Sequence, residues 1–121
     1  MHLEVALDVS DPAPMIAFWA ALLDYELPSE PRFEVPDRTY WSLVPRSGDG
    51  PRLVIQRVPE PRAGKSRLHF DIHVSDIEAE AERARTLGAV RVDRVPITEV
   101  GSIWIRMEDP EGNLFCLVER D

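Results

Sequence analysis

Hydrophobic and polar residues alternate along the first segment of the chain. Apolar side chains stand at every second position of Leu3–Val9. A period of two residues is typical of a β-strand that buries one face. The pattern changes at Asp11, which can cap a helix that has a proline at its first position. Apolar residues then follow at helical spacing, which predicts a helix over residues 12–23.

The pattern then predicts strands again until a segment rich in turn formers. Thr39–Val44 and Arg52–Val58 are expected as strands joined by a turn at 47–50, and a shorter strand is expected at Arg32–Val35. Prolines, charged residues and a glycine dominate residues 59–67. This composition is typical of a linker.

The second half of the chain follows the same order. Leu68–Val74 alternates, Asp76 can cap a helix that ends at Leu87, and Gly88 follows where a left-handed residue would end that helix. We expect three further strands and a turn between the last two, over Val90–Val95, Ser102–Met107, Asn113–Glu119 and the turn Asp109–Gly112.

The two halves also share a tripeptide at the same junction. Val9-Ser10-Asp11 and Val74-Ser75-Asp76 both end a strand and begin a helix, and they are 65 positions apart (74 minus 9). We interpret this as a duplication, with modules at 1–58 and 68–121 around the linker. The predicted class is α+β. Each sheet would pack one face on its helix and turn its more polar face toward a common cleft.

Composition narrows the possible partners. The chain has 121 residues, the size of one domain, and a net charge of −8, which argues against nucleic-acid and anionic-membrane partners. The longest apolar runs fall far short of the ~20 residues of a membrane span, and the N-terminus shows no signal-peptide pattern. Cys116 is the single cysteine, so no internal disulfide can form. We therefore expect a cytoplasmic location.

Several short motifs resemble those of the vicinal-oxygen-chelate superfamily, which includes glyoxalase I, bleomycin-resistance proteins and extradiol dioxygenases. The motifs are Ala17-Phe18-Trp19, Leu22-Leu23-Asp24-Tyr25, Val74-Ser75-Asp76, Leu87-Gly88-Ala89 and, most specifically, Glu108-Asp109-Pro110-Glu111-Gly112-Asn113. Asp24 stands where the family pattern usually has glycine, and Asp tolerates a left-handed conformation. The resemblance implies tandem βαβββ modules whose curved mixed sheet surrounds a cleft, with the helices outside.

A narrower resemblance is to an uncharacterised glyoxalase-like subgroup. It rests on Gln56–Pro61, Gly64-Lys65 and Arg67-Leu68-His69.

The resemblance to glyoxalase I also implies a metal site on the first and fourth strands of each module. The corresponding positions are Glu4 and His69, again 65 apart, with Gln56 and Cys116. Glu4 and His69 are good ligands, Gln56 is a poor one, and a thiol favours zinc over magnesium or iron. The alternative is that Glu4, Gln56 and His69 satisfy one another by hydrogen bonds, and that Cys116 is a small buried apolar residue.

Other residues are candidates for lining the cleft. Asp71 and His73 share the face of His69, although positions four apart on a strand are roughly 13 Å apart, too far to hold one ion. Trp104 and Trp41 could offer a flat apolar wall to a ligand, or belong to the core.

The linker holds two further candidates. Lys65 and Arg67 could meet an anionic group or could belong to a solvated loop.

Two functions follow from these expectations. The first is a small-molecule-binding protein with a degenerate metal site, which sequesters its ligand or catalyses an unknown step. The alternative is a divalent-metal-dependent lyase, isomerase or related enzyme in which Glu4 and His69 are catalytic, and in which Glu4 could act as the base. We also expect a homodimer, the commonest soluble oligomer.

Overall fold

The structure, a computed structural model, describes residues 1–28 and 39–120. The strand predicted at Arg32–Val35 lies outside these residues. The chain separates into two compact units, Met1–Arg62 and Ala63–Asp121. Their boundary falls inside the segment 59–67 that the sequence predicts as a linker.

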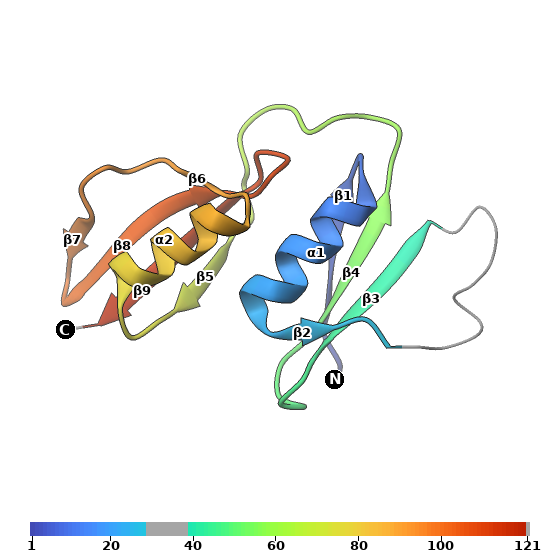
Figure 1. The fold of residues 1–121 in the computed structure, drawn as a ribbon, viewed down its shortest axis with the longest axis horizontal. Helices are drawn as coiled ribbons and strands as arrows, with labels where there is room; N and C mark the ends of the chain where they lie inside the picture. The colour runs from blue at the N-terminus through green and yellow to red at the C-terminus, as the bar shows by residue number, and fades with distance from the viewer. Residues whose placement is uncertain (29–38, 121) are drawn as a thin grey trace. The chain divides into compact units, whose positions relative to one another are not determined.

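The first unit is one helix on a four-stranded mixed sheet (Figure 1). Its sheet has the order β1-β4-β3-β2, in which β1 is parallel to β4 and the other pairs are antiparallel. The elements are β1 (Glu4–Val9), α1 (Pro12–Leu23), β2 (Tyr25–Glu26), β3 (Tyr40–Pro45) and β4 (Arg52–Arg57).

Helix α1 packs on β3 and β4, so each contributes one apolar face to the core. The buried residues are Met15, Phe18, Trp19 and Leu22 of the helix and Leu43, Leu53 and Ile55 of the sheet. The helix ends at Asp24, whose φ of 56° is left-handed. The expectation that an aspartate can occupy this position is confirmed.

The second unit repeats this plan with one extra short strand. Its sheet has the order β5-β9-β8-β6, β7 also pairs with β8, and the first strand β5 is again parallel to the last strand β9. The elements are β5 (Phe70–His73), α2 (Ile77–Leu87), β6 (Val90–Arg91), β7 (Ile97–Glu99), β8 (Ser102–Glu108) and β9 (Leu114–Arg120).

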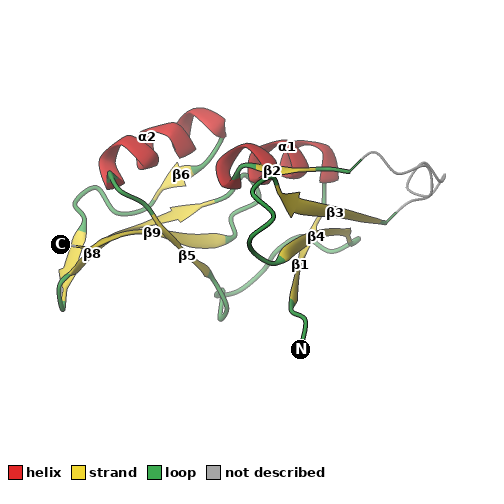
Figure 2. Ribbon diagram, turned by 90° about the horizontal axis from the view of Figure 1, so that it is seen from below, coloured by secondary structure: helices red, strands yellow, loops and turns green. Residues whose placement is uncertain are grey.

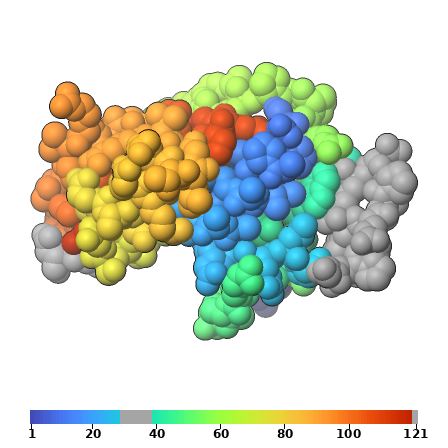
Figure 3. All heavy atoms as spheres, in the orientation of Figure 1, coloured from blue at the N-terminus to red at the C-terminus, as the bar shows by residue number. Residues whose placement is uncertain are grey.

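Helix α2 covers the face of this sheet that carries the buried residues of β8 and β9. Figure 2 shows each helix on one side of the strands of its own unit. In the space-filling view of Figure 3, the residues of α2, yellow to light orange, cover part of the face toward the viewer. Asp76 caps α2 by accepting a hydrogen bond from the Ala79 N–H at 3.1 Å, and Gly88 ends it with φ 119°.

The strand predicted over Val90–Val95 is wrong in its extent, because only Val90–Arg91 is a strand and β7 follows separately. Asp93 leaves the sheet edge, and its carboxylate accepts hydrogen bonds from the backbone N–H and the guanidinium of Arg106 on β8. Pro96, which has no N–H to donate, separates the two short strands.

No helix within residues 1–28 and 39–120 is long and apolar enough to cross a membrane.

Candidate functional site

The face of the second sheet that points away from α2 carries polar residues at strand positions that lie side by side. On β8 and β9 the buried residues Ile105 and Leu117 are paired and belong to the helix-covered face. Because strand side chains alternate, Arg106 and Cys116, paired with each other, belong to the opposite face. On β5, Asp71 is the partner of Cys116. One row across three strands therefore reads Asp71, Cys116, Arg106.

This face borders a cavity of about 530 Å³, which we call the site cavity. The strands β5, β8 and β9 and the hairpin between β7 and β8 all contribute to it. It is lined by His69, Asp71, His73, Glu99, Val100, Ser102, Trp104, Cys116 and Val118. All of these residues belong to the second unit. His69, Asp71, His73 and Trp104, which the sequence analysis named as candidates for a cleft, are all among these lining residues.

Three side chains in the site cavity lie close enough to share one ion. The Nδ1 atom of His69 is 3.1 Å from Oδ1 of Asp71. One ligand atom each from His69, Asp71 and Cys116 lies within 4.8 Å of the other two. Three protein ligands of N, O and S type are what a catalytic zinc site offers, with a fourth position left for substrate or water.

The thiol of Cys116 is held in its protonated form. Burial, the negative charge of Asp71, and a hydrogen bond to Asp71 together raise the pKa of Cys116 to about 11, although the charge of Arg106 opposes this. At neutral pH the thiol therefore donates a hydrogen bond to the carboxylate. A metal ion at this site would first have to displace that proton.

Arg106 is held at the far end of the row by Asp93. Its Nη2 lies 2.8 Å from Oδ1 of Asp93, and this hydrogen-bonded pair keeps the pKa of Asp93 below its usual value. The same aspartate also accepts from the Arg106 backbone N–H at 2.9 Å. Asp93 therefore binds both the backbone and the side chain of Arg106. This holds the positive charge of the guanidinium in place near Cys116.

Sequence reasoning missed Asp71 as a possible metal ligand and missed Asp93, Arg106 and Val100 altogether. The repeat pairs Asp71 with Ala6, 65 positions earlier, so the family positions gave no reason to choose it. The contribution of Arg106 depends on strand register, which no local pattern reveals.

In the first unit the predicted ligands Glu4 and Gln56 are not brought together. In the parallel pair of β1 and β4, Glu4 lies beside Arg52 and Gln56 lies beside Asp8. The two positions are four residues apart along the strands, roughly 13 Å. Glu4 instead has the His2 imidazole as a neighbour, with Nε2 3.6 Å from Oε1.

The register also changes which residue of the first unit corresponds to Cys116. Cys116 pairs with Asp71, whose counterpart by the repeat is Ala6, and Ala6 pairs with Val54. The first-unit equivalent of Cys116 is therefore Val54, two residues before Gln56.

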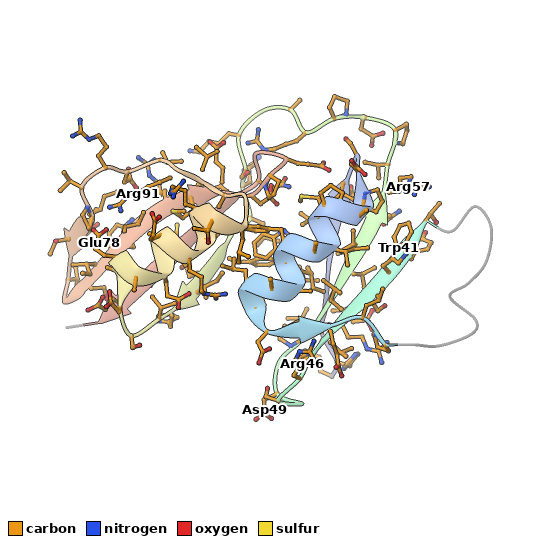
Figure 4. All side chains as sticks on the ribbon, viewed as in Figure 1. Trp41, Arg46, Asp49, Arg57, Glu78 and Arg91 are labelled. Carbon is orange, nitrogen blue, oxygen red and sulfur yellow. The ribbon has the colours of Figure 1, made fainter. Side chains whose placement is uncertain are left out.

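Trp41 lies on the opposite face of its sheet from Gln56. It pairs with Ile55 and shares its side with Leu43, both fully buried residues of the helix-covered face. The guanidinium of Arg57 lies 5.3 Å from the centre of the Trp41 ring, and Figure 4 shows the two side chains together. Trp41 therefore lies on the helix-covered side of its sheet and does not line the site cavity, and the expectation that it lines a cleft with Trp104 stays a prediction.

His73 lines the site cavity but is not among the three residues that could share an ion. This agrees with the expectation that His69 and His73 stand too far apart on one strand. A second cavity of about 580 Å³ is lined by Lys65, Ser66, Arg67, His69 and Leu114. His69 belongs to both cavities.

Comparison with known proteins identifies the family. Residues 4–118 match the model of the glyoxalase-like domain. No curated protein matches the chain.

Several solved structures share the fold at low sequence identity. A glyoxalase/bleomycin resistance protein/dioxygenase family enzyme from Burkholderia phytofirmans is 14% identical, with a TM-score of 0.75 over 98% of this chain and 97% of that one. The fosfomycin resistance protein FosX from Mesorhizobium loti is 18% identical, with a TM-score of 0.72 over 100% and 92%. FosX from Listeria monocytogenes, in a structure with Mn(II) and 1S,2S-dihydroxypropylphosphonic acid, is 16% identical, with a TM-score of 0.72 over 94% and 85%.

At these identities the structures establish a shared fold and no more. The family match spans nearly the whole chain, and the fold agrees with the α+β class predicted from the sequence. The resemblance drawn from the short motifs is therefore confirmed, and the chain belongs to the glyoxalase-like domain family.

Proposed function

We propose that this protein binds a small molecule in the site cavity, with a metal site that has degenerated from the glyoxalase pattern. The observation that carries the proposal is the cavity of about 530 Å³ lined on one side by Trp104 and on the other by His69, Asp71 and His73. Pockets for small ligands typically combine this volume with an aromatic wall and a few convergent polar groups.

The polar groups of the cavity can be satisfied without an ion. Asp71 accepts from the Cys116 thiol and lies 3.1 Å from His69. The thiol keeps its proton at neutral pH because its pKa is about 11. A protonated thiol at Cys116 leaves a weak ligand set in the second unit. The residues therefore support ligand binding by hydrogen bonds and stacking, with sequestration of the ligand as the simplest outcome.

Charge in the site cavity indicates the kind of ligand that would enter. Asp71 and Glu99 place two carboxylates near Trp104. The part of the ligand within this cavity should therefore be flat and apolar, and neutral or cationic rather than anionic.

A fragment screen read by tryptophan fluorescence tests the proposal. The protein has three tryptophans, of which Trp19 is buried, so Trp41→Phe leaves the half-buried Trp104 as the reporter in the site cavity. Binders should quench or shift this emission, and His69→Gln should weaken them. Flat neutral fragments that leave Trp104 unperturbed at millimolar concentration would count against the proposal.

A second candidate is a divalent-metal-dependent lyase, isomerase or related enzyme, which the approach of His69, Asp71 and Cys116 within 4.8 Å favours. A bound divalent ion would polarise a substrate oxygen and acidify an adjacent C–H bond. His69 and Asp71 would hold the ion, and Asp71 would give up its hydrogen bond from Cys116. Glu4, the base expected from the family pattern, stays a prediction.

Metal content distinguishes the two candidates. Protein purified without chelators and without added metal should contain far less than one equivalent under the first proposal. One equivalent, lost in His69→Ala, would favour the enzyme.

The homodimer expected from the sequence stays a prediction. Light scattering across micromolar concentrations should give twice the mass of one chain. A monomer over this range would contradict it.

A further inference from the structure

The second cavity differs from the site cavity in the sign of its charge. Its lining includes the cationic side chains of Lys65 and Arg67, the hydroxyl of Ser66, and His69. The site cavity carries the carboxylates of Asp71 and Glu99 and the same His69. His69 is thus a common wall between a cationic hollow and an acidic one.

The two cations of this hollow stand out in an acidic chain. The chain has 22 acidic and 14 basic residues, and Lys65 is its only lysine. Five of the described arginines are paired with a carboxylate, namely Arg46, Arg83, Arg85, Arg91 and Arg106. Lys65 and Arg67 form no ion pair among residues 1–28 and 39–120.

Two cations on the wall of one hollow repel each other unless an anion joins them. At close range such a pair attracts anions and raises their local concentration, although the net charge of the protein is negative. Arg and Lys both form charge-assisted hydrogen bonds to oxyanions, and a serine hydroxyl can donate one more.

We propose that Lys65, Ser66 and Arg67 form a binding subsite for an oxyanion group, a phosphate, phosphonate or carboxylate. This inference rests on the proposed function, because the oxyanion belongs to a ligand whose flat apolar part lies in the site cavity against Trp104. Because His69 lines both cavities, a short link past this residue would join the two parts of the ligand. The carboxylates on one side and the cations on the other fix the orientation of such a ligand.

The proposal predicts an order of affinities for simple probes. Phenylphosphonate, which joins a flat ring to an oxyanion, should bind more tightly than inorganic phosphate or benzyl alcohol, each of which supplies only one part. Its affinity should fall as salt is raised, because exposed charge pairs are screened. The affinity of benzyl alcohol should be nearly independent of salt.

Fluorescence titration of the Trp41→Phe protein with these probes tests the subsite. Lys65→Gln and Arg67→Gln should each weaken phenylphosphonate about fivefold, the effect of one partly exposed charged hydrogen bond. Both should leave benzyl alcohol unchanged. Arg94→Gln is the matched control, because Arg94 is an exposed arginine that lines neither cavity. It should leave every affinity as it is.

The outcomes separate this inference from the proposed function. If phenylphosphonate binds no better than benzyl alcohol and the Lys65 and Arg67 variants change nothing, the subsite is wrong and the proposed function stands. If neither aromatic probe perturbs Trp104, the proposed function fails. Amide chemical shifts with inorganic phosphate alone then test the subsite by itself: residues 65–67 should move, and their failure to move overturns the inference.

Discussion

The side chain of Asp109 holds Asn113 by three hydrogen bonds. The Asn113 side-chain amide donates to both carboxylate oxygens at 2.8 and 3.1 Å, and its backbone N–H donates to one of them at 2.9 Å. Asp109 is only 1% exposed, and it also accepts from the Glu111 N–H. The most specific family motif of the sequence is therefore a structural turn. It sets the register of β8 and β9, which places Cys116 opposite Arg106.

Replacing Asp109 should destabilise the second unit. Asp109→Ala leaves the N–H groups of Glu111 and Asn113 without their acceptor in a partly buried turn. Each such loss costs about 1–3 kcal/mol. We expect the free energy of unfolding in urea to fall by about 2–3 kcal/mol. Asn113→Ala keeps both backbone hydrogen bonds to Asp109 and should cost less. Equal stability of Asp109→Ala and the parent protein would show that the turn does not depend on this carboxylate.

Val100 occupies a conformation that suits it poorly. It has φ 46°, and Gly101 after it has φ 74°, in a two-residue hairpin loop between the paired Glu99 and Ser102. Loops of this kind favour Asn-Gly, and a β-branched residue is strained there. Val100 is also 95% exposed, so core packing does not offset the strain.

We therefore expect Val100→Asn to stabilise the protein by about 1 kcal/mol, seen as a rise in Tm of a few degrees. Val95→Asn is the matched control, because Val95 is 76% exposed and does not have a positive φ. It should give no gain. Since Val100 lines the site cavity, Val100→Asn should also weaken the binding of apolar fragments there. A Tm no higher than that of Val95→Asn would contradict the prediction.

Cys116 should react slowly with alkylating reagents. Its pKa is raised from 9.0 to about 11, chiefly by burial and then by the charge of Asp71. The thiolate fraction at pH 8 is then about 100-fold lower than that of an ordinary thiol, and the thiolate is the reactive form. We expect iodoacetamide to modify the native protein at least 100-fold more slowly than the urea-unfolded protein.

Asp71→Asn provides the test of the cause. It removes the negative charge that opposes ionisation of Cys116, so alkylation of the native protein should become faster. Glu99→Gln also removes a carboxylate from the site cavity but is absent from the causes of the Cys116 shift, and should leave the rate unchanged. If the rate in Asp71→Asn equals that of the parent protein, the charge of Asp71 does not control the thiol.

The same raised pKa sets the pH range in which Cys116 contributes to stability. The folded state binds the thiol proton more tightly than the unfolded state, so the contribution is complete below pH 9.0. It is lost as the pH rises from 9.0 toward about 11. Cys116→Ser should therefore unfold with a weaker dependence on pH over this range than the parent protein.

The local elements were predictable because their causes are local. Alternation found β1 and β5, and Asp76 and Gly88 marked the ends of α2. The face of Trp41 could also have been predicted, because it has the same period-two phase as Leu43 in its own strand.

The arrangement of the candidate site depends on contacts between distant segments. Asp71 meets Cys116 only through the parallel register of β5 and β9. In the first unit the corresponding register pairs Ala6 with Val54, so the position equivalent to Cys116 is Val54, two residues before Gln56. Motif spacing gives a position along a strand, but it does not give the neighbour on the next strand. The pairing of Gln56 with Cys116 as equivalent positions of the two modules was therefore chosen without knowledge of the register.

Zinc is the ion that this site should accept, weakly and with a steep dependence on pH. His69, Asp71 and Cys116 offer nitrogen, oxygen and sulfur ligands within 4.8 Å of one another, a set that suits zinc better than magnesium. The Cys116 thiol, with a pKa of about 11, must release its proton to bind. Below that value the affinity for zinc should rise about tenfold for each unit of pH, because one proton leaves for each ion bound.

Competition with a chelating dye between pH 7 and 9 measures this slope. Cys116→Ser should flatten the slope, and His69→Ala should abolish zinc binding. Near-stoichiometric magnesium, nickel or iron in the purified protein, lost in His69→Ala, would show that the site is a working metal centre and that its degeneration from the glyoxalase pattern is wrong.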